Sequence, residues 1–249
     1  MPKTVRLKIK RQEEPQSQPY WEEFEVPYQK NMNVISALME IQLKPVNVKG
    51  QATTPVVWDC SCLEEVCGAC SMIINNKARQ ACSALVDDLE QPIILEPLTK
   101  FPVACDLMVD RQIIFDYLKR AKAWIDVDGY FFSGPGPKVS ETTRRFAYDL
   151  SRCMSCGCCM EACPNFNEKS AFMGPAIIGQ VRLFTLHPTG QTNKAKRLEA
   201  LGGKGGIGDC GNSQNCIEIC PKDLPLRRAI GEMNREVFKY KVKRWLKSD

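Results

Sequence analysis

Histidine is almost absent from this chain of 249 residues, which contains a single one, His187. His187 precedes Pro188 at the predicted end of a helix, so we expect a structural or exposed side chain rather than a haem ligand or a proton donor. No other grouping of side chains is typical of general acid–base catalysis. We therefore assign no catalytic acid or base.

Long apolar runs are missing as well. No stretch approaches the ~18–20 apolar residues that a membrane-spanning helix needs. The N-terminus, residues 1–6, is charged but has no apolar segment behind it, so no signal peptide is expected. The formal net charge is only +5, and residues 222–249 hold nine Lys or Arg against four Asp or Glu, which accounts for the excess. This balance argues against a nucleic-acid-binding surface as the main feature.

Cysteine is the residue that the chain has in abundance, with fourteen copies. A secreted disulfide scaffold is one explanation, but such scaffolds are short, rich in loops and exported. This chain has none of these properties. The thiols are therefore predicted to be reduced metal ligands in a cytosolic compartment.

The first ~110 residues predict strands and one helix, in a mixed sheet with the helix packed across it, a β-grasp arrangement. Residues 34–43 carry a helical apolar stripe, and Asn33 is available as the helix cap. Asn75-Asn76 joins the run at 71–74 to the segment from Lys77 onward, which is typical of a hairpin. The predicted strands cover residues 5–9, 24–26, 71–74, 77 onward and 93–95.

The second half predicts helices, so the expected fold class is α+β with an all-helical C-terminal domain. A linker at 129–138 contains Gly134-Pro135-Gly136-Pro137, the clearest breaker run in the chain. We place the domain boundary near Val109, which gives domains of residues 1–109 and 110–249. The predicted helices cover residues 111–125, 140–150, 175–186, 194–201 and 226–246.

The first cysteine run has the spacing of a plant-type [2Fe–2S] site. Cys62, Cys67 and Cys70 form C-x4-C-x2-C, and Cys82 follows after eleven more residues. Three thiolates wrapping one small anionic cluster need a tight backbone, for which Gly68 supplies conformational freedom. A zinc site would need a pair of CxxC knuckles, and only one is present here, so a zinc-stabilised structural protein is disfavoured.

Two further runs follow the pattern of bacterial two-cluster ferredoxins, in which the fourth cysteine of each run serves the other cluster. The second run has Ser213 where its second cysteine belongs. Crossing the fourth ligands leaves one site with four thiolates, a [4Fe–4S] cluster, and one with three, which suits [3Fe–4S]. A [4Fe–4S] cluster with a Ser213 oxygen ligand is the alternative, disfavoured because oxygen is a harder donor. The [4Fe–4S] ligands are predicted to be Cys153, Cys156, Cys159 and Cys220, and the [3Fe–4S] ligands Cys163, Cys210 and Cys216.

Cys60, Cys105 and Cys158 fit no run, and we expect them to be buried free thiols that pack as small hydrophobic groups. Cys158 lies beside Cys159, but taking it as the ligand would break the second spacing of its run. Cys159 is therefore kept as the ligand.

A plant-type run followed by two bacterial-type runs with one missing cysteine resembles the iron–sulfur subunit of succinate dehydrogenase and fumarate reductase, respiratory complex II. The resemblance covers nearly the whole chain. Residues 33–38 and 62–70 look most like the menaquinone-linked branch, whose membrane anchor is typically a single dihaem cytochrome b. The segments that carry the family resemblance are the runs at 62–82 and 153–164, and residues 172–176 and 210–222.

The resemblance implies an electron relay within the tricarboxylic acid cycle and the respiratory chain. A flavoprotein subunit with covalent FAD would oxidise succinate and pass electrons through [2Fe–2S], [4Fe–4S] and [3Fe–4S] to quinone, here menaquinone, held by the membrane anchor. The chain would then lie peripherally on the cytoplasmic face of the cell membrane. The positions that match the family's quinone pocket are Pro164, Asn165, Gly211 and Ser213. Glu168 and Gly211 replace the Trp and His of ubiquinone-reducing members, so a ubiquinone site of that design is not expected.

Several alternatives remain open from sequence. A quinol:fumarate reductase subunit would use the same relay in the opposite direction. A soluble multi-cluster ferredoxin would typically be smaller and acidic, and a related reductase outside complex II would carry further cysteine-rich domains in some cases. The basic segment 227–247 is typical of an amphipathic helix with a solvated face, or alternatively of one lying near anionic lipid headgroups or the loops of the anchor.

Overall fold

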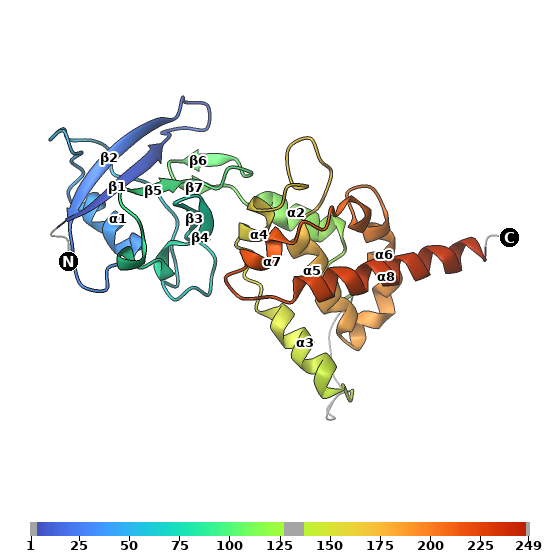
Figure 1. The fold of residues 1–249 in the computed structure, drawn as a ribbon. Helices are drawn as coiled ribbons and strands as arrows, with labels where there is room; N and C mark the ends of the chain where they lie inside the picture. The colour runs from blue at the N-terminus through green and yellow to red at the C-terminus, as the bar shows by residue number, and fades with distance from the viewer. Residues whose placement is uncertain (1–3, 127–136, 248–249) are drawn as a thin grey trace. The chain divides into compact units, whose positions relative to one another are not determined.

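The computed structural model describes residues 4–126 and 137–247. It divides the chain into two compact units (Figure 1). The first comprises Met1–Arg111 together with Met154–Glu161, and the second comprises Gln112–Cys153 together with Ala162–Asp249. The predicted linker at 129–138 falls mostly outside the described residues.

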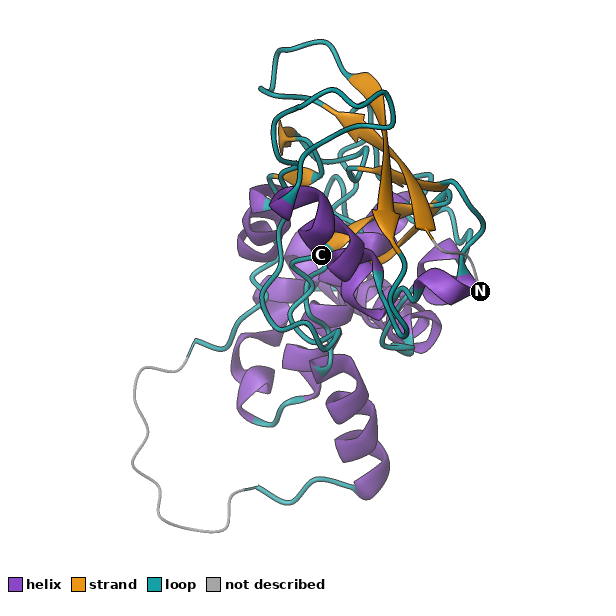
Figure 2. Ribbon diagram, turned by 90° about the vertical axis from the view of Figure 1, so that its left-hand side faces the viewer, coloured by secondary structure: helices purple, strands orange, loops and turns teal. Residues whose placement is uncertain are grey.

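The first unit is built on a five-stranded mixed sheet in the order β2-β1-β5-β3-β4 (Figures 1 and 2). β1 pairs with β5 in parallel, and the other pairs are antiparallel. Alternate residues of β1, such as Val5, Leu7 and Ile9, are fully buried, because one face of the sheet covers the core. The predicted β-grasp sheet is confirmed. The strands are β1 (Thr4–Arg11), β2 (Tyr20–Pro27), β3 (Ser71–Ile74), β4 (Lys77–Gln80) and β5 (Ile93–Glu96).

The helix α1 (Val34–Leu43) packs its apolar face into the same core. Asn33 is its N-cap, as predicted, and its side chain accepts a hydrogen bond from the backbone N–H of Ser36. The β3–β4 hairpin turns at Asn75 and Asn76, whose φ angles of 46° and 65° are those of a tight hairpin turn.

Some short elements of the first unit were not predicted. A two-stranded sheet of β6 (Val103–Cys105) and β7 (Met108–Val109) closes the unit after β5, and α4 (Cys158–Glu161) belongs to the unit although it comes much later in the chain. These elements have two to four residues, which is too short for a periodic apolar pattern. The 3₁₀ turns of the unit are η1 (Ala81–Ser83) and η2 (Val86–Asp88).

Every regular element in the described part of the second unit is helical (Figure 1), as predicted. α8 packs against α5 and α6, and α3 packs against α5. The predicted helix at 111–125 ends earlier, at Arg120, and Lys122 has a left-handed φ of 55°. The helices are α2 (Gln112–Arg120), α3 (Glu141–Ser151), α5 (Pro175–Leu186), α6 (Lys194–Gly202), α7 (Asn215–Glu218) and α8 (Leu226–Trp245), with 3₁₀ turns η3 (Thr189–Asn193) and η4 (Ile207–Asp209).

Candidate functional site

The loop before β3 directs its backbone amides at cysteine sulfur atoms. The Cys62 Sγ accepts hydrogen bonds from the amides of Glu64 at 3.4 Å, Val66 at 3.2 Å and Cys67 at 3.3 Å. These three hydrogen bonds lower the pKa of the Cys62 thiol to about 7. The loop therefore favours a thiolate at Cys62, the form that ligates iron.

Left-handed backbone conformations make this arrangement possible. Leu63, Glu65 and Gly68 have φ angles of 59°, 55° and 75°, which bend the loop so that successive amides point inward. The amide of Glu65 reaches the Cys82 Sγ at 3.3 Å, and the amide of Ala69 reaches the Cys67 Sγ at 3.4 Å. The loop from Cys62 to Cys70 thus folds toward Cys82, which lies just after the second strand of the hairpin.

Cys70 and Cys82 form the inner side of this group. Cys70 ends the loop, Cys82 lies in η1, and both are buried, whereas Cys67 is exposed. Burial, together with the neighbouring Cys82, raises the pKa of the Cys70 thiol to about 12. The structure therefore brings together the four cysteines predicted for [2Fe–2S], with amide donors suited to an anionic cluster.

Arg111 ties the loop to the late segment of the first unit. Its guanidinium donates to the carbonyl oxygens of Gly68, Ala69 at 3.1 Å and Cys156 at 3.5 Å, and lies 3.7 Å from a carboxylate oxygen of Asp59. A planar cation with several donors can satisfy several carbonyls at once. No sequence pattern singled out Arg111, because its role depends on residues that are far apart along the chain.

Gln80 makes a second link between the hairpin and the late segment. Its Nε2 lies 3.6 Å from the Cys158 Sγ and 3.0 Å from the Ser71 Oγ, and its Oε1 lies 3.7 Å from the Cys70 Sγ. Cys158 is fully buried, which confirms the prediction of a packed thiol at that position. A hydrogen bond from Cys158, outweighing burial, lowers the pKa of the Cys156 thiol to about 7.

The other two unassigned cysteines differ from expectation. Cys60 is exposed, so the prediction of a buried thiol was wrong there: the loop before Cys62 has no regular structure and turns its side chain to solvent. Cys105 is half-buried at the end of β6. His187 is exposed at the C-cap of α5, as expected.

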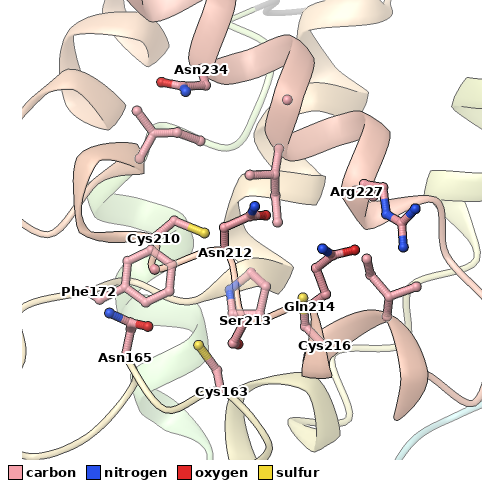
Figure 3. A pocket seen from close by; sticks show the side chains of 16 residues that line it. Cys163, Asn165, Phe172, Cys210, Asn212, Ser213, Gln214, Cys216, Arg227 and Asn234 are labelled. Atoms are coloured by element: carbon pink, nitrogen blue, oxygen red, sulfur yellow. The ribbon is translucent and has the colours of Figure 1, made fainter.

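In the second unit, Cys163, Cys210 and Cys216 border a cavity of about 350 Å³ (Figure 3). Burial, followed by the nearby Cys163 and Cys210 thiols, raises the pKa of Cys216 to about 11, as expected for three thiols around one space. No group of three or more His, Cys, Asp or Glu side chains among the described residues is arranged to hold a single metal ion. The three thiols instead surround a space that a larger inorganic group can occupy.

Three of the predicted quinone-pocket residues, Asn165, Gly211 and Ser213, line the same cavity. Pro164 is exposed and is not among the lining residues. A Cβ atom added to Gly211 would lie 2.5 Å from the Asn165 Oδ1, so the Asn165 amide occupies the space beside Gly211.

Sequence reasoning missed the lining residues that come from α8 and from the segment before α5. They are Phe172, Arg227, Ile230, Gly231 and Asn234. The α8 residues recur at helical spacing, but this spacing alone does not show which side of the helix faces a cavity.

Cys153 and Cys220 are both half-buried members of the second unit, just after α3 and α7 respectively. Cys159 is half-buried in α4. None of the helices among residues 4–126 and 137–247 combines the length and the apolar character needed to cross a membrane.

The fold and the cysteine sites define an iron–sulfur electron carrier with a ferredoxin-like β domain and a helical two-cluster domain. Residues 6–116 match the family model described as a 2Fe-2S iron-sulfur cluster binding domain, and residues 149–224 match that of a 4Fe-4S dicluster domain. An iron–sulfur cluster, when bound, takes up and returns single electrons.

Comparison with known proteins narrows this class. The chain is 62% identical over 234 residues to the succinate dehydrogenase iron-sulfur subunit of Bacillus subtilis, covering 94% of this chain and 92% of that protein. It is 30% identical to the fumarate reductase iron-sulfur subunit of Haemophilus influenzae, covering 86% and 85% of the two chains. The chain belongs to the family of succinate dehydrogenase iron–sulfur subunits, which transfer electrons through iron–sulfur clusters.

A solved structure shares the fold. A chain of the Sdh1 complex of Mycobacterium smegmatis in the apo form superposes with a TM-score of 0.76 at 18% identity, over 96% of this chain and 97% of that chain. This likeness at low identity shows that the two-domain architecture is common to both proteins.

Proposed function

We propose that this subunit relays electrons from the FAD of a flavoprotein subunit, through [2Fe–2S], [4Fe–4S] and [3Fe–4S] clusters in that order, to quinone at a membrane anchor. The observation that carries the proposal is the cavity of the second unit, where three cysteines and Ser213 meet. Three thiolates, with a hydroxyl where a fourth thiolate would be needed, are what is expected around a cluster that lacks one iron, because the hard hydroxyl oxygen competes poorly with thiolate for iron.

The ligand assignment follows the cysteine spacing, and the local geometry supports it at two of the three sites. The amide–sulfur hydrogen bonds of the 62–70 loop support [2Fe–2S], and the shared cavity supports [3Fe–4S]. We assign residues 1–109 to the [2Fe–2S] domain and 110–249 to the domain of the other two clusters. The ligands are Cys62, Cys67, Cys70 and Cys82 for [2Fe–2S]; Cys153, Cys156, Cys159 and Cys220 for [4Fe–4S]; and Cys163, Cys210 and Cys216 for [3Fe–4S].

The quinone end of the relay lies beside the [3Fe–4S] ligands. Asn165 offers an amide beside Gly211, and Ser213 offers a hydroxyl, so both can hydrogen-bond a quinone oxygen. Because Gly211 has no side chain, further hydrogen-bonding groups come from an anchor subunit, a haem b cytochrome. We infer menaquinone as the acceptor and the cytoplasmic face of the cell membrane as the location.

Succinate oxidation is the proposed direction, since identity to a succinate dehydrogenase subunit is 62% against 30% to a fumarate reductase subunit. Fumarate reduction is the second candidate, because the same clusters carry electrons either way. Turnover of the purified complex in both directions with menaquinone analogues distinguishes them.

Iron and sulfide analysis combined with EPR tests the cluster assignment. The wild-type complex is expected to contain about nine irons per chain, in clusters of two, four and three, with an EPR signal in the oxidised state from the three-iron centre. Ser213→Cys restores the missing thiolate, so it is expected to gain about one iron and lose that signal. Ser213→Ala is the matched control and is expected to behave like the wild type.

Each result separates the alternatives. If the wild type holds about ten irons and Ser213→Ala loses one, Ser213 is an oxygen ligand of a [4Fe–4S] cluster and the three-iron assignment is wrong. Stoichiometric zinc without sulfide would contradict the whole relay. A flavoprotein and a haem protein that co-purify with the chain are the expected partners.

A further inference from the structure

The helix α8 has one buried face and one face turned to solvent. Leu226, Ala229, Met233 and Val237 are buried where α8 packs against α5 and α6. At 3.6 residues per turn, Gly231, Phe238, Val242 and Trp245 lie on the side of the helix away from this buried face, and Asn234 lies at its flank.

The outer face of the last two turns is apolar, although it is exposed. Phe238 is 68% exposed, Val242 40% and Trp245 67%, and these three residues, spaced by four and three, form the outward stripe. Leu246, beside it, is 63% exposed. The solvent face of an amphipathic helix is normally polar, so an apolar stripe opposite the buried face indicates a second surface that it contacts.

The outward stripe continues the face of α8 that borders the thiol cavity. Arg227, Ile230, Gly231 and Asn234 line that cavity with Cys210 and Ser213 (Figure 3). Phe238 follows Asn234 by four residues, one helical turn further along the same side. The cavity and the outward stripe therefore face the same side of the second unit.

Positive charge accompanies the stripe. Arg235 and Lys239 are exposed and adjoin Phe238 and Val242 at helical spacing, and the exposed Lys241 adjoins Phe238 and Trp245 in the same way. The acidic residues of α8 lie elsewhere, since Glu232 pairs with Arg182 and Arg228, and Glu236 pairs with Lys194. Aromatic and apolar side chains flanked by Lys and Arg are the composition of helices that lie in the interface of an anionic bilayer.

We propose that α8 lies on an anionic lipid surface, with Phe238, Val242 and Trp245 inserted among the headgroups. The occupant is lipid because basic residues flank an apolar stripe that is opposite the packed face. The helix thereby turns the cavity beside Ser213 toward the membrane, from which a quinone enters. This last step rests on the proposed function, whereas the lipid contact itself rests on α8 alone.

Flotation of the full-length, cluster-loaded chain with vesicles tests the contact. Vesicles of phosphatidylcholine are compared with vesicles that also contain phosphatidylglycerol. The wild-type chain is expected to float with the anionic vesicles, with a blue shift of tryptophan emission that Trp245→Phe removes while floating normally. Raising the salt concentration is expected to weaken the binding.

Charge-reversal pairs give matched variants. Arg235→Glu with Lys239→Glu, beside the outward stripe, is expected to lower the affinity for anionic vesicles by roughly tenfold or more. Lys243→Glu with Lys247→Glu changes the net charge equally, but these lysines border the groove between α8 and α6. This pair is expected to lower the affinity by less than about threefold. Phe238→Ser with Trp245→Ser, which leaves the charge unchanged, is expected to abolish flotation.

Other outcomes overturn the proposal. Wild-type chain with native circular dichroism that stays in solution with anionic vesicles contradicts it, as does equal loss of binding for the two charge-reversal pairs. Binding through Phe238 and Trp245 only to membranes that contain an integral membrane protein would make a protein the occupant. The oxidised-state EPR signal is recorded on the same samples, so lipid binding without that signal refutes the cluster assignment alone.

Discussion

At the scale of single residues, Gly68 shows most directly how the chain brings two cysteine runs together. It has a φ of 75°, and a Cβ atom placed there would lie 2.8 Å from the Cys156 Cβ and 2.9 Å from the Met154 carbonyl oxygen. Its own carbonyl oxygen accepts a hydrogen bond from Arg111. Glycine is required here both for its left-handed conformation and for the close approach of the backbone.

Gly68→Ala is expected to destabilise the first unit by about 2–4 kcal/mol, the sum of left-handed strain and overpacking. Gly50→Ala is the matched control, since Gly50 has the same φ of 75° but no atom within 4 Å of its added Cβ. That substitution is expected to cost about 1 kcal/mol. Chemical denaturation followed by circular dichroism and by the visible absorbance of the clusters measures both. Equal effects would show that strain alone matters at Gly68.

The ligand cysteines could be proposed from spacing, because thiolate spacing reflects the cluster that the thiolates wrap. The residues that surround the ligand cysteines could not be proposed in this way. Arg111, Gln80 and Asn234 come close to the cysteine sites only in the folded chain, and no pattern in the neighbouring sequence indicates these contacts. The exposure of Cys60 was mispredicted because this residue lies only two positions before the predicted ligand Cys62, in a loop without regular structure. Average burial preferences of cysteine do not show which side chain of such a loop faces solvent.

At the scale of elements, Arg11 links the C-terminal end of β1 to the neighbouring strand and loops through ion pairs and hydrogen bonds. Its side chain is buried, its Nε lies 2.9 Å from the Asp106 Oδ1, and one terminal nitrogen lies 2.6 Å from the Glu22 Oε2. The other terminal nitrogen donates to the carbonyl and hydroxyl oxygens of Thr54. Asp106 also accepts from the amides of Gln12 and Val57, so removal of Arg11 leaves buried carboxylates without their cation.

Arg11→Ala is expected to lower the free energy of unfolding of the first unit by about 3–5 kcal/mol, because it leaves buried charge uncompensated. Lys8→Ala, on the same strand, removes an exposed ion pair with Glu23 and is expected to change it by less than about 0.5 kcal/mol. Denaturant titrations of the two variants provide the comparison. If Arg11→Ala with Asp106→Asn is as unstable as the sum of the single variants, the two side chains do not act as a pair.

Elements with strong local signals could be predicted to within a residue or two. The Asn33 cap, the Asn75-Asn76 turn, and Pro175 at the first position of α5 each fix an end by local backbone chemistry. α4, α7 and the β6–β7 pair could not be predicted, since each is held by its surroundings rather than by its own periodicity.

At the scale of the whole molecule, neither of the two compact units is a single continuous stretch of sequence. The segment Met154–Glu161 lies between stretches of the second unit but belongs to the first. Glu161 accepts hydrogen bonds from the Thr99 hydroxyl at 2.5 Å and the Lys100 amide at 3.1 Å, and a Cβ on Gly157 would lie 3.0 Å from the Phe101 ring. The proposed domains of residues 1–109 and 110–249 follow the order of the chain, and composition changes along the sequence do not report such a return of a later segment.

Hydrogen exchange of the intact chain tests this division. In Arg11→Ala, amides of Met154–Glu161 are expected to exchange faster together with those of β3 and β4, while α5 and α8 keep their wild-type rates. Peptide-resolved mass spectrometry measures the three regions in one experiment, with Lys8→Ala as the control. Exchange of Met154–Glu161 at the rate of α5 would place the segment in the second unit.

The amide–sulfur hydrogen bonds around Cys62 have a consequence for the reduction potential. Six such bonds reach the sulfur atoms of Cys62, Cys67 and Cys82, and all six come from peptide N–H groups. Hydrogen bonds to thiolate sulfur offset the charge that an added electron brings, and so raise the potential. Because the donors belong to the main chain, we expect that side chains at 63–66 can vary with little effect on the potential of a cluster held by this loop, provided that the φ angles of the loop are kept.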